Sequence, residues 1–300
     1  MKILKTLCLL AFAAVMPAML TSCDDDDEPS SSASSSSSSY SGPYFGLRDC
    51  GKVISSIQDV GPSPHFTTFP ISFVYDGSGR VVEVNYENSY ENSNVTVSYD
   101  YNSQTGKEVE TNDSDEIFSF DADANGRFNS LTYVYDSREK HANEFKYNSD
   151  GNVISVVETF SVVVDGKWAT PWCVTYTLIW DGDLLTSVRC TAGYQPTYES
   201  DSEVKITYSD VDNKYRTPLC GLSTMLFDGD FYPNEISISP AKLPKKVECY
   251  VQGGQDEGEY EYACRYTLND EGFIEKEYVG DIADSEDYVD FRYTYADKEF

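Results

Sequence analysis

Positive charge is scarce in this sequence. Its 300 residues include 22 lysines and arginines against 51 aspartates and glutamates, which gives a formal net charge of −29 at pH 7. A chain this acidic repels phosphate backbones and anionic lipid headgroups, so nucleic acid is not expected as a partner. The composition suits cations, neutral sugars or basic proteins as partners.

Catalytic and zinc-binding patterns are missing as well. Only two histidines are present, His65 and His141, so a zinc site or a histidine-based triad would need one of them to be well placed. The sequence has no G-x-S-x-G nucleophile motif, and no carboxylate pair stands out for glycoside hydrolysis. An enzyme is therefore not expected, and calcium is the one cofactor that we consider below.

Long apolar runs are confined to the start of the chain. Lys2 and Lys5 precede the apolar run 6–20, which is too short to span a bilayer comfortably as a permanent helix. A short positive start followed by such a run is typical of a secretory signal peptide. We therefore predict that residues 1–22 are a signal peptide that is removed before folding.

The end of this run resembles a bacterial lipobox. Residues 20–23 read "LTSC", with a leucine three positions before Cys23 and small residues between them. The resemblance implies that Cys23 is acylated and becomes the mature N-terminus, so that the protein is membrane-anchored through lipid. The alternative is an ordinary cleavage site next to an incidental cysteine.

Residues 23–43 are predicted to be an acylated, disordered tether. The acidic run 24–28 stays solvated, and it resembles the signal that sends lipoproteins of Bacteroidetes to the outer face of the outer membrane. The serine run 30–39 offers no apolar groups to bury. We predict a lipid-anchored outer-membrane protein at the cell surface; the alternative is a spacer that faces the periplasm.

The remainder, residues 44–300, is predicted to be a single β-meander domain. Stretches such as "FVYDGSGRVVEV" (73–84) and "FKYNSDGNVISV" (145–156) alternate apolar and polar residues on both sides of an Asp/Asn/Gly cluster. These clusters tolerate the backbone conformations of hairpin turns. The fold class is therefore all-β, an antiparallel meander forming a curved sheet or soluble barrel, with a helical interruption expected at 217–227.

Three motifs resemble a family of Bacteroidetes lipoproteins, the domain of unknown function 4595. They are "YDGSGR" (Tyr75–Arg80), "YNSDGN" (Tyr147–Asn152) and "SPAKLPKKV" (Ser239–Val247), and the resemblance covers roughly residues 45–300. It implies a porin-like fold and no known activity. A lipid-embedded barrel needs strands with one continuous apolar face, which stretches such as 97–113 do not provide. We therefore expect a barrel that stands in water.

One loop resembles the start of a calcium-binding loop. "DADANG" (121–126) places Asp121, Asp123 and Asn125 at alternate positions before a glycine, which is a pattern that can wrap a hard cation. The position of the bidentate glutamate is taken by Thr132. Calcium bound by these three residues is one hypothesis, and a plain hairpin turn is the other.

Two tryptophans are candidates for ligand binding. Trp168 and Trp172 lie in the short stretch "KWATPW" (167–172), and exposed tryptophans can stack on sugar faces. The alternative is burial, because Trp172 begins an alternation of large apolar residues that continues to Trp180 and is typical of one buried strand face.

Hairpin arithmetic predicts two disulfides in the exported chain. A two-residue turn at Asp181-Gly182 places Cys173 opposite Cys190. A turn around Asp256-Glu257 likewise places Cys249 opposite Cys264, whereas Cys50 and Cys220 are left over. The alternative is that these cysteines are small buried hydrophobes with free thiols.

Together these features predict a binding or interaction module rather than an enzyme. The first hypothesis is a surface-tethered outer-membrane lipoprotein that recognises a glycan or another extracellular polymer. The alternative is an accessory structural subunit that docks on an outer-membrane complex.

Overall fold

The computed structural model describes residues 45, 47, 48, 50–61, 70–88, 93–111, 115–135, 138–194, 198–227, 233–252, 257–284 and 288–299. The predictions for residues 1–43, including lipidation of Cys23, and for His65 lie outside this part of the chain. The strands are β1 (Lys52–Asp59), β2 (Ile71–Tyr75), β3 (Val81–Asn88), β4 (Ser93–Asp100), β5 (Thr105–Glu110), β6 (Glu116–Ala122), β7 (Phe128–Tyr135), β8 (Glu139–Tyr147), β9 (Val153–Val164), β10 (Lys167–Asp181), β11 (Leu184–Tyr194), β12 (Tyr198–Asp212), β13 (Lys242–Gln252), β14 (Gly258–Leu268), β15 (Ile274–Asp281) and β16 (Tyr288–Asp297).

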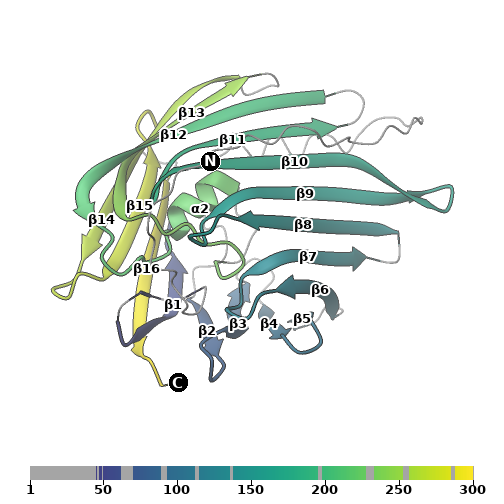
Figure 1. The fold of residues 1–300 in the computed structure, drawn as a ribbon, viewed down its shortest axis with the longest axis horizontal. Helices are drawn as coiled ribbons and strands as arrows, with labels where there is room; N and C mark the ends of the chain where they lie inside the picture. The colour runs from purple at the N-terminus through teal and green to yellow at the C-terminus, as the bar shows by residue number, and fades with distance from the viewer. Residues whose placement is uncertain are drawn as a thin grey trace.

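The strands form one closed antiparallel barrel (Figure 1). Each strand pairs with its neighbours in sequence, and β16 closes the circle against β1, where Phe291 lies opposite Asp59. Strands β8 to β12 are visibly longer than β2 to β6, so one side of the barrel extends further than the other. The predicted all-β meander is confirmed, and of the two predicted forms the structure shows the barrel.

Alternation along the strands separates an apolar interior from a polar exterior. On β4, Val95, Val97 and Tyr99 are buried and point inward, whereas the intervening Thr96 and Ser98 point outward. Because side chains alternate across a strand, this pattern assigns one face to the core and the other to the surroundings. The interior is therefore filled by Val, Ile, Leu, Phe and Tyr side chains from all around the barrel.

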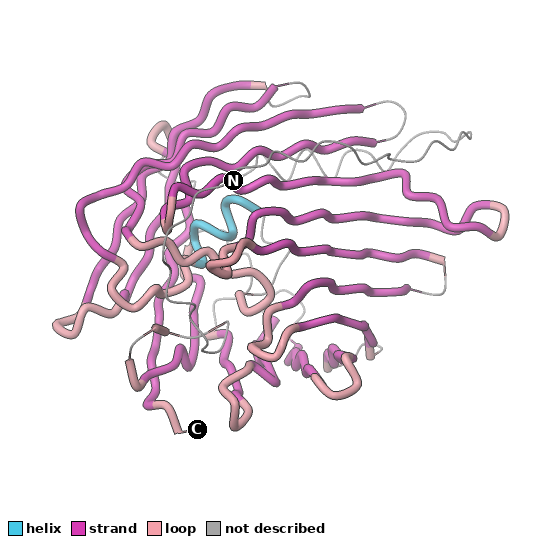
Figure 2. The backbone as a smooth tube through the Cα atoms, viewed as in Figure 1, coloured by secondary structure: helices cyan, strands magenta, loops and turns pink. Residues whose placement is uncertain are grey.

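A short helix, α2 (Cys220–Phe227), lies inside the barrel (Figure 2). It confirms the helical interruption expected at 217–227. Seven of its eight residues are buried, and the helix packs against β15 and β16 on one side while Phe227 meets the ring of Tyr176 on β10 at 5.1 Å. The helix therefore crosses the interior and fills it at this level. Among the described residues, none belongs to a helix long and apolar enough to cross a membrane.

The start of α2 is held by a carboxylate from the barrel wall. Glu277 on β15 is fully buried and accepts hydrogen bonds from the backbone N–H groups of Gly221 (2.9 Å) and Leu222 (3.1 Å). Tyr293 on β16 donates to the same carboxylate (2.5 Å), and it accepts from the N–H of Cys220 (2.9 Å). These bonds satisfy N–H groups that the first turn of a helix leaves without an intrahelical partner.

The first predicted disulfide is wrong because the hairpin register differs. Asp181 pairs with Leu184, so the turn is centred one residue later than expected, and a bulge near Trp180 shifts the strands once more. Cys190 consequently lies opposite Tyr176 instead of Cys173. Because the total shift is odd, the two cysteines point to opposite faces of the sheet.

The second predicted disulfide is wrong for a related reason. The paired strands end at Val251 and Gly258, so this turn also lies elsewhere than predicted, and Cys249 faces Tyr260. The shift of four positions leaves Cys249 and Cys264 on the same inner face, but about 13 Å apart along the strands. All six cysteines among the described residues are free thiols, in agreement with the alternative.

Candidate functional site

Four five-residue turns of one construction lie on the same rim of the barrel. They are Asp76–Arg80, Asp123–Arg127, Asn148–Asn152 and Asn269–Phe273. In each turn the first side chain accepts hydrogen bonds from the backbone N–H groups of the third and fifth residues, at 2.8–3.0 Å. The fourth residue is a glycine with φ between 82° and 91°, a conformation that L-residues rarely adopt. The repeated Asp/Asn/Gly clusters are thus confirmed as turns, and we call this end of the barrel the turn rim.

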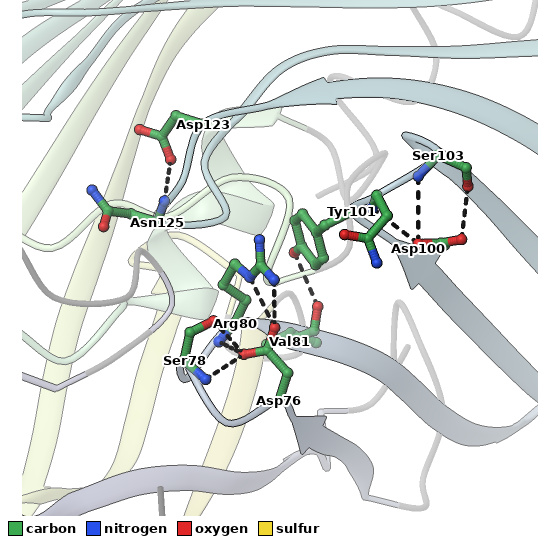
Figure 3. A network of polar contacts seen from close by, with 10 residues as sticks. Asp76, Ser78, Arg80, Val81, Asp100, Tyr101, Ser103, Asp123 and Asn125 are labelled. Carbon is green, nitrogen blue, oxygen red and sulfur yellow. Dashed lines mark hydrogen bonds and ion pairs between the residues drawn. The ribbon is translucent and has the colours of Figure 1, made fainter.

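Arginine and tyrosine side chains connect successive hairpins along the turn rim (Figure 3). Arg80 pairs with Asp76 at 2.8 Å and lies over the ring of Tyr101 at 4.4 Å. The hydroxyl of Tyr101 in turn donates to the carbonyl of Val81 at 3.0 Å. Asp123, Arg127, Tyr147 and Phe128 repeat the same contacts between the β6–β7 turn and the end of β8. The polar side chains of these segments of the turn rim therefore form ion pairs and hydrogen bonds with neighbouring rim residues, which indicates a structural role.

The three predicted calcium ligands do not converge on one point. The carboxylate of Asp123 accepts hydrogen bonds from the backbone and guanidinium of Arg127, as well as from the N–H of Asn125. Asp121 lies outside the turn on β6, where it accepts from Gln104 and Asn129. Within the described ranges, no group of three or more His, Cys, Asp or Glu side chains could hold a metal ion. The geometry is that of the alternative, a hairpin turn.

The opposite end of the barrel presents a different inner surface. Strand pairing places Glu108, Glu116, Tyr133, Tyr135, His141, Glu158, Phe160 and Trp172 on the inward face of β5 to β10, and we call this set the inner wall. Most of these side chains keep part of their surface accessible, in contrast to the buried core below them. The inner wall is therefore the part of the interior that a ligand can reach.

Aromatic rings run along the inner wall from strand to strand. The ring of Tyr133 lies 6.3 Å from that of Tyr135 at an interplanar angle of 9°, and Tyr135 lies 5.4 Å from His141. His141 is 4.7 Å from Phe160, which pairs with Trp172 on the next strand. The rings form a continuous track of flat apolar faces, and such faces combine large contact area with a fixed geometry.

Carboxylates accompany this aromatic track. Glu108 and Glu116 lie directly opposite each other on β5 and β6, and Glu158 is buried on β9. Burial, with a further contribution from these two opposite carboxylates, raises the pKa of Tyr135 to about 12. Burial lowers the pKa of His141, which favours the neutral form of its imidazole at pH 7.

The two tryptophan candidates lie on opposite faces of the sheet. Trp172 points inward, half-buried against the core, whereas Trp168 points outward, 44% exposed, with the ammonium of Lys140 over its ring at 5.7 Å. Their spacing of four would place them on one face of a regular strand. A bulge between Ala169 and Trp172 adds one residue and reverses the orientation. A shared tryptophan platform is therefore excluded, and Trp172 alone belongs to the inner wall.

Comparison with known proteins identifies the fold. No family model matches the chain, and no curated protein matches it. Among solved structures, a porin-like protein from Bacteroides uniformis aligns with a TM-score of 0.54 and 14% identity, over 81% of this chain and 98% of that one. A porin-like protein from Bacteroides vulgatus aligns with a TM-score of 0.52 and 11% identity, over 80% and 97%. The chain therefore has a porin-like β-barrel fold.

Proposed function

We propose that this protein is a lipid-tethered outer-membrane lipoprotein whose barrel stands in water and binds a saccharide at the inner wall. The porin-like fold shared with proteins of Bacteroides supports an association with the outer membrane. We also propose that the chain belongs to the lipoprotein family with the domain of unknown function 4595, a proposal that rests on the resemblance of its lipobox, ending at Cys23, and of its repeated turns to those of that family.

The outer surface supports a barrel surrounded by water. On β11 and β12, Arg189 forms a two-pronged ion pair with Asp201 at 2.6 and 3.2 Å. On β13 and β14, Lys246 bridges to Glu248 at 3.0 Å and to Glu261 at 2.6 Å. Each arginine or lysine on a lipid-facing strand costs about 2–4 kcal/mol near the bilayer centre, and acidic residues add a smaller cost, so a wall with several such groups is unsuited to lipid.

The filled interior supports binding rather than conduction. Open porins have a polar, water-filled channel, whereas here α2 crosses the barrel and the side chains below the inner wall are buried and apolar. Helix α2 and these buried side chains obstruct the interior, which supports binding of a ligand rather than passage of a solute.

The aromatic track of the inner wall is the observation that carries the proposal. Its flat faces, from Tyr133 to Trp172, can stack on the apolar faces of sugar rings, and its carboxylates can accept hydrogen bonds from hydroxyl groups. The orientation agrees with a tethered receptor. The first strand starts at Lys52 beside Asp297 on the turn rim, so the inner wall opens at the end away from the anchor.

One feature of the outer surface favours the alternative of an accessory subunit. Ile117 on β6 is 68% exposed, and Val134 on the neighbouring strand β7 is 49% exposed. Exposed apolar side chains on adjacent strands can contact a partner protein. Purification of the tagged protein after cross-linking in cells tests this alternative, since a stoichiometric membrane partner that is lost in Ile117→Ser would support it.

The saccharide proposal predicts that the two tryptophans differ in their effect on binding. Trp172→Ala should weaken binding of an array-selected glycan about tenfold, because it removes one stacking surface from the track; a factor of ten corresponds to about 1.4 kcal/mol. Trp168→Ala is the matched control and should leave the affinity unchanged, because that side chain points outward. Glycan-array screening followed by calorimetric titration measures both.

Unfolding curves show whether each variant keeps the native fold. Equal losses of affinity in the two variants, or a protein that binds no glycan on a broad array, would contradict the proposal.

A further inference from the structure

Three cationic side chains lie together on the outer wall of strands β14 to β16. Lys276 and Arg292 are direct register partners on β15 and β16. Arg265 on β14 lies opposite Tyr278, two positions along β15 from Lys276. Residues next to them in sequence are buried inside the barrel: Cys264, Glu277 and Phe291. Because side chains alternate across a strand, the three cations point outward, and all three are exposed. We call Arg265, Lys276 and Arg292 the cationic patch.

The charges of the cationic patch are not balanced by carboxylates. None of its three side chains forms an ion pair among the described residues, whereas Arg189 and Lys205, elsewhere on the outer wall, pair with Asp201 and Glu203. Two acidic residues lie beside the patch without pairing with it, Glu275 and Asp290. Like charges directly opposite each other destabilise a sheet. An anion bound from outside would relieve the repulsion between the cations of β15 and β16.

Two half-buried tyrosines adjoin the cationic patch on the same face of the wall. The ring centroids of Tyr278 and Tyr288 are 5.1 Å apart at an interplanar angle of 31°, and the guanidinium of Arg265 lies over the ring of Tyr278 at 5.3 Å. Gly280, the register partner of Tyr288, makes room for this arrangement, because a Cβ atom there would overlap the hydroxyl of Tyr278. The outer wall therefore combines two aromatic rings with guanidinium and ammonium groups at one place.

From this combination we infer that the cationic patch and the two tyrosines bind an acidic polysaccharide, at a site separate from the inner wall. Guanidinium and ammonium groups bind carboxylates and sulfates through charge-assisted hydrogen bonds, and tyrosine rings can stack on the faces of sugar rings. An acidic peptide would meet the same cations without offering a sugar ring to the tyrosines. An anionic membrane surface would also meet the negative charge of the rest of the barrel, which a single polymer chain crossing the patch largely avoids.

Oligosaccharides that differ only in charge test the inference. The protein is titrated at about pH 6.5, where carboxylates are ionised, with a galacturonate hexamer and its neutral methyl ester, and with a sulfated galactose hexamer and its unsulfated counterpart. At least one acidic hexamer should bind about tenfold more tightly than its neutral counterpart, and the one with the larger preference identifies the anionic group that the site takes. The double variant Lys276→Gln, Arg292→Gln should abolish this preference.

The control is the double variant Arg189→Gln, Lys205→Gln, which removes one arginine and one lysine from the outer wall of β11 and β12 and should retain the preference. Trp172→Ala should retain it too, so that a failure here is distinguishable from a failure of saccharide binding at the inner wall. No preference for either acidic hexamer, or an equal loss in both double variants, would overturn the inference. Hexaglutamate that binds as tightly as the acidic hexamers, or phosphatidylglycerol vesicles that bind when neither hexamer does, would show an acidic peptide or a membrane as the partner and would overturn it as well.

Discussion

Gly106→Ala should lower the free energy of unfolding by about 3 kcal/mol, at the upper end of the cost of overpacking a core. Gly106 points inward on β5, and a Cβ atom there would overlap the ring of Phe118, its register partner on β6. That ring cannot move away, because it is 2% exposed and packs against Tyr133 at 4.7 Å and Tyr99 at 5.7 Å. Denaturant unfolding of both proteins measures the loss.

The same substitution at a different glycine provides the control. Gly77 lies in a turn where an added Cβ would meet nothing within 4 Å. Gly77→Ala should therefore change the free energy of unfolding by less than about 0.5 kcal/mol. Similar values for the two variants would mean that Phe118 does not fill the space over Gly106, and that the packing of β5 and β6 differs from the one described.

The second large effect is a dependence of stability on pH that originates at Glu277. Burial raises the pKa of this carboxyl from 4.5 to about 7, against the opposing hydrogen bonds from Tyr293 and the first turn of α2. Between these two values the folded protein holds a proton that the unfolded chain releases. The contribution to stability is thus fully present below about pH 4.5 and is lost as the pH rises to 7, by about 3 kcal/mol.

Unfolding free energies of the parent and of Glu277→Gln at pH 5 and pH 7.5 isolate this contribution. The glutamine keeps an acceptor for the N–H groups of Gly221 and Leu222 but does not titrate. Between pH 5 and pH 7.5 the free energy of unfolding of Glu277→Gln should fall much less than that of the parent. The outward control Glu144→Gln should show the same fall as the parent. An unchanged pH dependence in Glu277→Gln would show that this carboxyl is already ionised in the folded protein at pH 5.

The architecture was predictable because its signals are local. Alternation fixes strands and their buried faces, as for Val95, Val97 and Tyr99, and the Asp/Asn/Gly clusters fix the turns. The loss of alternation at 217–227 located α2 correctly. Alternation does not predict the number of strands or the closure of β1 on β16, because that pairing joins residues at opposite ends of the chain.

The errors arose where a single extra residue changes register. The turn between β10 and β11 lies one residue later than expected, and a bulge follows it, so Cys173 and Cys190 separate. Another bulge, beside Pro171, reverses Trp172 relative to Trp168. Because the side-chain period of a strand is two, each insertion moves every later residue to the other face. A bulge depends on how two strands pair, so the sequence of either strand alone does not predict it.

The inner wall was missed because its strands break the ordinary pattern. In "TGKEVE" (105–110) the glutamates point inward and Val109 points outward, which is the reverse of a water-facing strand. The inverted alternation, together with His141 within a run of charged residues, was the available signal. It becomes interpretable only after the register is known, since the same six residues would otherwise be assigned to the surface.

The central claim, a porin-like barrel that stands in water on a lipid tether, is tested most directly by fractionation of Cys23→Ser in cells. The parent should sediment with the outer membrane, whereas the variant should leave the outer-membrane fraction, either as a soluble folded protein or as a precursor that keeps its signal peptide, because the ion-paired outer surface is unsuited to lipid. If Cys23→Ser instead remained in the outer membrane like the parent and resisted alkaline carbonate extraction, the barrel itself would be embedded, and the account would be contradicted.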